Sequence, residues 1–343
     1  MARTAEDPPA ARLPGAFQWG ERTEREGVVC REFVLQPAAG VAHGGPEAPA
    51  AGDPRPVPGV LWQAAAPRAG APLIAFGHGA SGDRHQAPIP YLARRLVRDH
   101  GGAAIAIDGP VHGQRRQGDG ARGAFWKEWA RAGTVDDMIA DWRRVLDAAL
   151  ALPELAASPL GYWGLSMGTI YGAPLVAAEP RIRAAVLGLM GISGPNEAYL
   201  ARIAADAARI EVPVLFLLQL EDELFTRAQC LALFDAFASP DKRIHAHPGA
   251  HAAVPVEDID HSLMFLVARL DGAMAGNAAS DASGRGTDGT GTGTQQARPD
   301  AAATDRPTEP PLDPTDREPT ERGPTERGPT DRGPTDRGPS GIG

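Results

Sequence analysis

One short motif in this sequence has the residues of a catalytic nucleophile. Gly164-Leu-Ser-Met-Gly168 matches the pattern G-x-S-x-G, in which a serine lies on a sharp turn between a strand and a helix. The apolar run Leu160-Gly-Tyr-Trp-Gly-Leu165 predicts a buried strand before Ser166, and Met167–Ala178 predicts a helix after it. Such a turn exposes the serine hydroxyl and places the backbone N–H of Met167 at a helix N-terminus, where it can stabilise an oxyanion. The alternative is a serine without catalytic function in an ordinary strand–helix turn.

A serine hydroxyl needs a histidine to take its proton and an acid to orient that histidine. In hydrolases with this turn, the acid and then the histidine follow the serine along the chain, in loops after later strands. Glu221-Asp-Glu223 follows one late predicted strand, and Pro248-Gly-Ala-His251 follows the next. We therefore predict a catalytic triad of Ser166, Asp222 and His251, with Glu221 and Glu223 as fallback acids.

The elements around these residues alternate as expected for a doubly wound, mostly parallel α/β sheet. An N-terminal β-hairpin is predicted from the apolar runs at 28–35 and 57–64, with an irregular segment at 112–133. His245 and His247 lie on one face of the last predicted strand, which favours packing over catalysis. The remaining strands are expected at 72–76, 103–108, 160–165, 184–190, 212–218 and 243–247, and the helices at 91–100, 134–150, 167–178, 199–210, 226–237 and 256–270.

With these motifs in this order, the sequence resembles the α/β-hydrolase superfamily, and within it the dienelactone-hydrolase-type and related prolyl-oligopeptidase-type serine hydrolases. The resemblance covers about Pro72 to Leu270. It includes Gly77-His-Gly-Ala-Ser-Gly82 after one strand and Asp108-Gly-Pro-Val-His-Gly113 after the next. One position departs from the pattern, because dienelactone hydrolases proper have a cysteine where Ser166 stands. Their lactone substrate therefore does not carry over.

The resemblance also implies roles for the residues of these two glycine-rich loops. It makes the N–H of Ala80 the second donor of the oxyanion hole, beside that of Met167. His78 is then structural, and Asp108 and His112 shape a loop. The implied activity is hydrolysis of carboxylic esters through an acyl-enzyme, with no cofactor and no metal.

The sequence says less about the substrate than about the reaction. Little room for a large lid exists between the strand ending near Met190 and the helix starting near Tyr199, which argues against a long-chain lipase and favours small soluble esters. Phe125, Trp126 and Trp129 lie in the irregular segment and could line an acyl or alcohol pocket. Packing of Trp126 and Trp129 in a helix is an equal alternative.

Composition excludes several other classes of function. Among 343 residues, 34 Lys and Arg stand against 43 Asp and Glu, so no basic surface recommends a nucleic acid partner. Cys30 and Cys230 cannot form a disulfide framework, which fits a reducing cytoplasm. The first twenty residues lack the features of a secretory signal, and no apolar stretch reaches the roughly 20 residues of a membrane span. We expect a cytoplasmic enzyme with no membrane partner.

The two ends of the chain differ in composition from the part between them. We expect a flexible N-terminus at 1–16, an α/β-hydrolase domain at 17–270 and a disordered, low-complexity tail at 271–343. The tail loses nearly all large apolar residues and carries a Pro-Thr-Asp/Glu-Arg-Gly repeat between Pro319 and Gly338, which cannot form a core. A solubilising appendage is the favoured interpretation, and a tail that binds an unidentified partner is the alternative.

Three other functions compete with the esterase. A metal hydrolase could use His245, His247 and His251 as ligands with Asp222, but it leaves the serine motif unexplained. A non-catalytic binding protein could keep the hydrolase fold. A serine peptidase acting on short peptides would use the same triad, although the sequence contains no propeller domain of the kind with which prolyl oligopeptidases select peptides.

Overall fold

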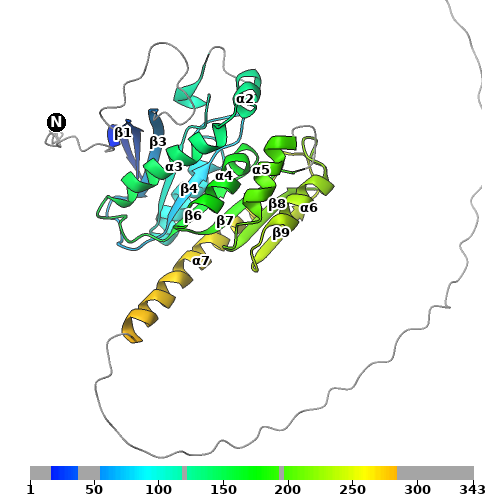
Figure 1. Cartoon of the computed structure of the whole chain (residues 1–343). Helices are drawn as coiled ribbons and strands as arrows, with labels where there is room; N and C mark the ends of the chain where they lie inside the picture. The colour runs from blue at the N-terminus through cyan, green and yellow to red at the C-terminus, as the bar shows by residue number, and fades with distance from the viewer. Residues whose placement is uncertain (1–16, 38–54, 118–121, 193–196, 284–343) are drawn as a thin grey trace, which may run out of the picture. The chain divides into compact units, whose positions relative to one another are not determined.

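The computed structural model describes residues 17–37, 55–117, 122–192 and 197–283 (Figure 1). These residues form one nine-stranded sheet in the order β1-β2-β3-β5-β4-β6-β7-β8-β9. The first three strands pair antiparallel, β3 lies antiparallel to β5, and the strands from β5 to β9 are parallel. This confirms the predicted mostly parallel sheet. The strands are β1 (Phe17–Arg25), β2 (Val28–Leu35), β3 (Val57–Ala64), β4 (Leu73–Gly77), β5 (Ala103–Ile107), β6 (Leu160–Gly164), β7 (Ile182–Gly188), β8 (Val214–Gln219) and β9 (Lys242–His247).

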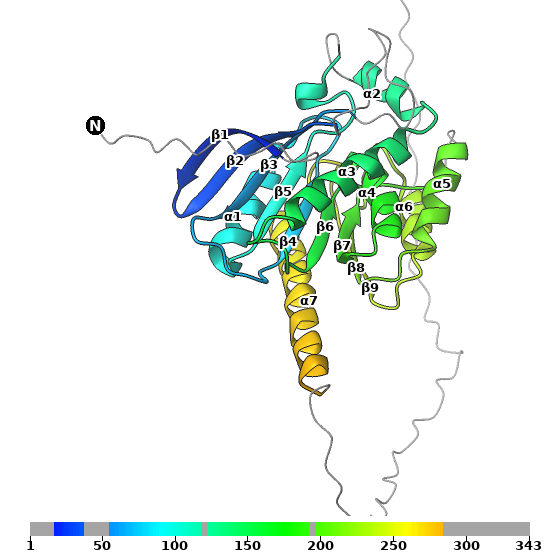
Figure 2. The ribbon, with the colours of Figure 1, turned by 60° about the vertical axis from the view of Figure 1, so that its left-hand side comes forward.

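Helices cover both faces of the sheet, so the sheet has a core on each side. One core combines one sheet face with α2 to α6, and the other combines the opposite face with α1 and α7. Figures 1 and 2 show α3 and α4 on one side of the central strands and α7 on the other. The helices are α1 (Ile89–His100), α2 (Arg122–Trp129), α3 (Thr134–Leu150), α4 (Met167–Ala178), α5 (Glu197–Ala207), α6 (Arg227–Ala236) and α7 (Val256–Ser283), with a short 3-10 helix at Gly113–Arg115.

The central strands are apolar along their whole length because both of their faces are buried. Every residue of β4, β5 and β6 is buried, as expected for parallel strands between two helical layers. Helix α1 shows the complementary pattern, since it buries Leu92, Leu96 and Val97 on one face. It ends at Gly101, which has a φ of 63° and donates its N–H to the carbonyl of Val97.

Three elements differ from the prediction. Strand β1 was not predicted, because its polar sequence lies at the edge of the sheet and is mostly exposed. It joins β2 through Glu26 and Gly27, both with positive φ, the geometry of a tight hairpin turn. Helix α2 lies inside the segment expected to be irregular, and α7 runs to Ser283 rather than ending at Leu270. Apolar periodicity ends at Leu270, but the alanine-rich stretch beyond it has high helix propensity.

The predicted flexible N-terminus at 1–16 and the repeats between Pro319 and Gly338 lie outside the described residues. Within the described ranges, no helix combines the length and the apolar character needed to span a membrane.

Candidate active site

Ser166 lies on a strained turn between β6 and α4. Its φ is 57° and its ψ is −118°, a conformation that costs a non-glycine residue of order 1–3 kcal/mol. Glycines on both sides make the turn possible: a Cβ at Gly164 would lie 2.8 Å from the carbonyl oxygen of Gly168, and one at Gly168 would lie 2.5 Å from that of Gly77. The N–H of Ser166 donates to the carbonyl of Gly188, 3.0 Å away, which ties the turn to the end of β7.

His251 contacts both of its predicted partners. Its Nε2 lies 2.9 Å from the Oγ of Ser166, and its Nδ1 lies 2.7 Å from an Oδ of Asp222. Because an ionised carboxylate only accepts hydrogen bonds, Nδ1 carries the proton and Nε2 is free to accept the serine O–H. Asp222 follows β8 and His251 follows β9, so the contacts form at the carboxyl edge of the parallel strands.

The acid loop holds Asp222 in its ionised form. Its second carboxylate oxygen accepts the backbone N–H of Leu224 at 2.8 Å and that of Phe225 at 3.0 Å. Burial alone would raise the pKa of Asp222, but the hydrogen bonds from His251 and from these two N–H groups outweigh it and hold the pKa below its ordinary value.

The two fallback acids make other contacts. The carboxylate of Glu223 accepts the backbone N–H of His251 at 2.8 Å, and this hydrogen bond lowers the pKa of Glu223. Glu221 meets the base loop through its backbone, donating its N–H to the carbonyl of Gly249 at 3.2 Å. Of the three acids in the loop, Asp222 is the one whose side chain is hydrogen-bonded to the imidazole.

The predicted oxyanion donors leave the sheet at the same point. Strands β4 and β6 pair in register with Gly77 beside Gly164, so the loop that carries Ala80 and the turn that carries Met167 start side by side. Among the backbone hydrogen bonds of the described residues, none uses the N–H of Ala80 or of Met167. This leaves both N–H groups without a backbone acceptor among these hydrogen bonds.

Two histidines and one aspartate connect the loop after β4 to the loop after β5. His78 accepts the N–H of Gly109 at Nε2, so its Nδ1 donates to the carbonyl of Gly79; both distances are 2.8 Å. Burial lowers the pKa of His78 to about 4, so this buried ring is neutral. His112 contacts the carbonyl of Ala80 at 3.1 Å. These contacts agree with the structural role that the family resemblance implies for both rings.

Asp108 makes the third connection. Its carboxylate pairs with the guanidinium of Arg84 at 2.6 Å and accepts the N–H of Gln114 at 2.8 Å. Burial outweighs these interactions and raises the pKa of Asp108 above its ordinary value. The carboxylate thus holds the two loops together without touching the triad.

Helix α2 presents one of its three predicted pocket aromatics to solvent. Phe125 and Trp129 are buried and stack with their ring planes 13° apart, whereas Trp126 is 55% exposed. The ring of Phe125 lies 5.7 Å from that of His112. Figure 2 shows α2 beyond the ends of the central strands, at the top of the view. Trp126 is thus the residue with surface available for a ligand, while the other two pack the helix.

The remaining histidines of the base region have a different partner from His251. His245 and His247 both contact the carboxylate of Asp258, at 3.0 and 2.9 Å. Within the part of the chain that the structure describes, no group of three or more His, Cys, Asp and Glu side chains is arranged to hold a metal ion.

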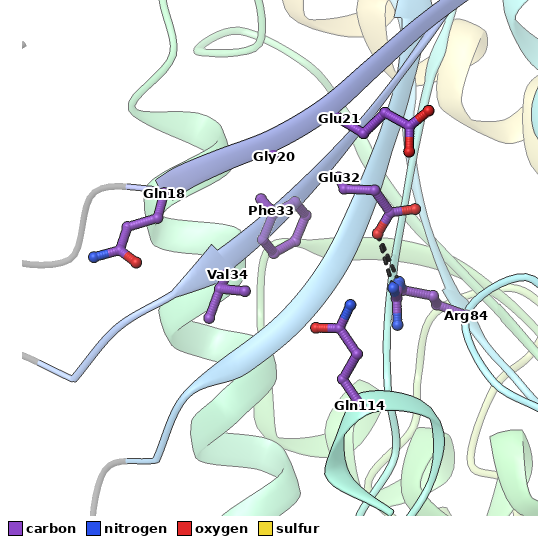
Figure 3. A pocket seen from close by; sticks show the side chains of 8 residues that line it. All are labelled: Gln18, Gly20, Glu21, Glu32, Phe33, Val34, Arg84 and Gln114. Carbon is purple, nitrogen blue, oxygen red and sulfur yellow. Dashed lines mark hydrogen bonds and ion pairs between the residues drawn. The ribbon is translucent and has the colours of Figure 1, made fainter. Parts of the chain in front are cut away.

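A cavity of about 400 Å³ lies on the N-terminal strands, and Ser166, Asp222 and His251 are not among the residues that line it. Figure 3 shows Glu32 and Arg84 joined at its wall, and the ion pair measures 2.9 Å. The cavity contains no residue of the Ser166, Asp222 and His251 cluster, so its size does not make it the reaction site. It is lined by Gln18, Gly20, Glu21, Glu32, Phe33, Val34, Arg84 and Gln114.

The fold has clear counterparts among solved structures. No protein-family model matches the chain, and no curated protein matches it in sequence. A cold-adapted esterase from an Arctic intertidal metagenomic library is 33% identical, with a TM-score of 0.62, and the similarity covers 74% of this chain and 99% of that one.

Two more distant structures are similar in fold alone. An acetyl xylan esterase from a Paenibacillus species is 18% identical, with a TM-score of 0.56, over 74% of this chain and 88% of that one. A candidate dienelactone hydrolase from Klebsiella pneumoniae is 20% identical, with a TM-score of 0.53, over 63% of this chain and 93% of that one.

Proposed function

Because this chain belongs to the α/β-hydrolase family, among its dienelactone-hydrolase-like members, we propose that it is a serine hydrolase that cleaves carboxylic esters of small soluble molecules. The observation that carries the proposal is the position of His251, 2.9 Å from the Ser166 hydroxyl and 2.7 Å from Asp222. A serine, a base and an orienting acid at these distances are the requirement for acyl transfer.

The proposed reaction has two halves. His251 takes the proton of Ser166 as the hydroxyl oxygen attacks the ester carbonyl, and the N–H groups of Met167 and Ala80 hold the resulting oxyanion. The imidazolium then protonates the departing alcohol, which leaves an acyl-enzyme. Water, activated by the same imidazole, attacks the acyl group and releases the acid. Asp222 remains ionised throughout, since its lowered pKa favours the charged form.

We assign substrate selectivity to the exposed surface of α2. Trp126 offers an exposed ring next to the buried pair Phe125 and Trp129, so we expect it to contact the acyl or alcohol part of the ester. The similar structure that is 33% identical is an esterase, which supports an ester as the substrate. A serine peptidase on short peptides is the alternative within the same chemistry, and a non-catalytic binding protein is the alternative outside it.

Kinetics on two substrate series test this proposal. Short p-nitrophenyl esters should be hydrolysed with ordinary enzyme kinetics, whereas peptide p-nitroanilides should react at least about 100-fold more slowly, and Ser166→Ala should remove nearly all turnover. The matched control is Ser158→Ala, which changes a serine before the start of β6 and should keep wild-type kinetics. Faster cleavage of the anilides would favour the peptidase, and an inert wild-type protein would favour the binding protein.

We further propose that the hydrolase domain works without the C-terminal tail, and that the enzyme is cytoplasmic, in keeping with the free thiols of Cys30 and Cys230. A chain that stops after Ser283 keeps all of α7 and should retain the kcat/KM of the full chain. A loss of activity in that truncated chain would assign the tail a part in the reaction.

A further inference from the structure

The side chain of His112 joins the loops after β4 and β5. Its Nε2 lies 3.1 Å from the carbonyl oxygen of Ala80, and its Nδ1 lies 2.6 Å from that of Pro110. Carbonyl oxygens only accept hydrogen bonds, so a hydrogen bond at either contact needs a protonated ring nitrogen. A neutral imidazole has one N–H and donates to one of the two carbonyls, whereas an imidazolium donates to both. The Nε2–H that the contact with Ala80 needs is present in the Nε2 tautomer and in the imidazolium.

The contact matters because two peptide units meet at the α-carbon of Ala80. The first unit contains the carbonyl of Gly79 and the N–H of Ala80, and its carbonyl accepts the Nδ1–H of His78. The second contains the carbonyl of Ala80, which His112 holds. Each unit is planar and moves through φ and ψ alone. The φ and ψ angles of Ala80 set the angle between the two units, and a hydrogen bond on each unit opposes a change in that angle.

The backbone around His112 is strained in a way that supports this role. Val111, directly before it, has a φ of 55°, which is rare for a β-branched residue. Such a conformation costs of order 1–3 kcal/mol and persists where the surroundings enforce it. Gly113, directly after it, also has a positive φ, and a Cβ there would collide with the carboxyl group of Asp108. The residues on both sides of the histidine thus have positive φ, and a side chain at Gly113 would not fit beside Asp108.

Packing fixes the ring itself. It lies 5.3 Å from the ring of His78 and 5.7 Å from that of Phe125, both nearly edge-on. Phe125 is in turn stacked on Trp129 within α2. The ring of His112 thus connects the aromatic residues of α2 to the loop that carries the Ala80 N–H.

We propose that His112 is a positioning residue that aims the N–H of Ala80 at the oxyanion and couples its direction to α2. The inference rests on the proposed function, because it assigns the donor a task in ester hydrolysis. Oxyanion donors act only when they point at the place where charge develops, so a loosened Ala80 should weaken binding of the transition state more than binding of the ester.

Three substitutions separate the donor from the ring. His112→Gln places an amide nitrogen near the position of Nε2, His112→Asn places one near Nδ1, and His112→Phe keeps the ring without any donor. With p-nitrophenyl acetate, the Phe and Asn variants should lose roughly 10- to 100-fold in kcat, somewhat less than the loss of a whole oxyanion donor. Their KM should stay within about 2-fold, and the Gln variant should stay within about 3-fold of the wild-type kcat.

A transition-state analogue gives a second measurement. The inhibition constant of an alkylboronic acid, which forms a tetrahedral adduct with serine, should rise in each variant by about the factor by which kcat/KM falls. His85→Asn is the matched control, since His85 lies on the loop after β4 that also carries Ala80, but its ring bonds to Glu32 at 2.6 Å. It should leave both measurements unchanged.

The possible outcomes are distinct. If the wild-type protein hydrolyses the ester and the Phe variant has the same kcat, the role of His112 is overturned and the esterase proposal stays intact. The same conclusion follows if the Gln variant is as slow as the Phe and Asn variants. A wild-type protein with no esterase turnover would overturn both. If the Phe variant fails to fold, as judged by its thermal midpoint, the comparison of Gln with Asn decides the question.

Discussion

At the scale of single residues, the hydrogen bonds of one imidazole determine what the site can do. Asp222 fixes the proton of His251 on Nδ1, and the opposite nitrogen then faces the hydroxyl of Ser166. Glu223 holds the same histidine by its backbone N–H. The two acids therefore act on different parts of His251, and substitution can tell them apart.

We predict that Asp222→Asn lowers kcat/KM for short esters by about 10⁴-fold, because the amide favours the wrong tautomer of His251. Glu223→Gln should cost less than about 10-fold, since the amide oxygen still accepts the backbone N–H. Steady-state kinetics of both variants checks this. A larger loss in the Gln variant than in the Asn variant would move the role of the acid to Glu223.

Sequence order pointed to three residues, Ser166, Asp222 and His251, whose side chains the structure brings into hydrogen-bond contact, because the fold fixes which loops reach the carboxyl edge of the sheet. It was not sufficient to separate Trp126 from Phe125 and Trp129. Exposure of an aromatic side chain depends on the packing of its helix, and the short α2 has too few turns to show which face is buried. The role of the ring nitrogens of His112 was also beyond the sequence, since the resemblance implied only that this residue shapes a loop.

At the scale of elements, the strand–turn–helix unit around Ser166 depends on close contact between β4 and α4. A Cβ on Gly168 would lie 2.5 Å from the carbonyl oxygen of Gly77. The hydroxyl of Tyr162 also donates to the carbonyl of Gly168 at 2.7 Å. No side chain fits between the start of the helix and the neighbouring strand.

We predict that Gly168→Ala lowers the free energy of unfolding by about 1–3 kcal/mol through overpacking and reduces esterase activity, because the backbone of α4 must move away from β4. Gly20→Ala is the control, since a Cβ there would meet its nearest atom at 3.4 Å, an ordinary contact. Urea unfolding monitored by tryptophan fluorescence measures both variants. An alanine at 168 as stable as the wild type would show that the two elements are less tightly packed than described.

Most of the strands could be predicted from the sequence, including the partly exposed β2 and β9, but β1 could not. Strands β4 to β8 are apolar runs that only a covered parallel sheet explains. Strand β1 is an exposed edge with little apolar signal, and it gains its hydrogen bonds from β2 rather than from its own composition. The end of α7 could not be predicted from apolar periodicity, which stops at Leu270.

At the scale of the whole molecule, several carboxylates respond to acid in the same direction. The pKa values of Glu32, Glu128, Glu179 and Asp222 are lowered, because hydrogen bonds and nearby positive charges outweigh burial at each site. A group whose pKa is lower in the folded state stabilises the fold above its unfolded pKa, and this contribution disappears as the pH falls through the folded pKa. The raised pKa of Asp108 acts in the opposite sense.

We therefore expect the free energy of unfolding to fall from about pH 6.5 downward, because His78 takes up a proton in the unfolded state but stays neutral in the folded state until about pH 4. It should continue to fall below about pH 4, as the carboxylates with lowered pKa values are protonated. Urea unfolding at a series of pH values measures this. A stability that increases as the pH is lowered below 4 would contradict the summed direction of these pKa shifts.

The most direct measurement of the central claim is covalent labelling with a fluorophosphonate, followed by peptide mapping. The reagent reacts with a serine whose proton is removed by a positioned base. We predict one modified peptide with the label on Ser166, a parallel loss of esterase activity, and little labelling of His251→Ala. Label on another residue, or continued ester hydrolysis by protein fully labelled at Ser166, would contradict the account.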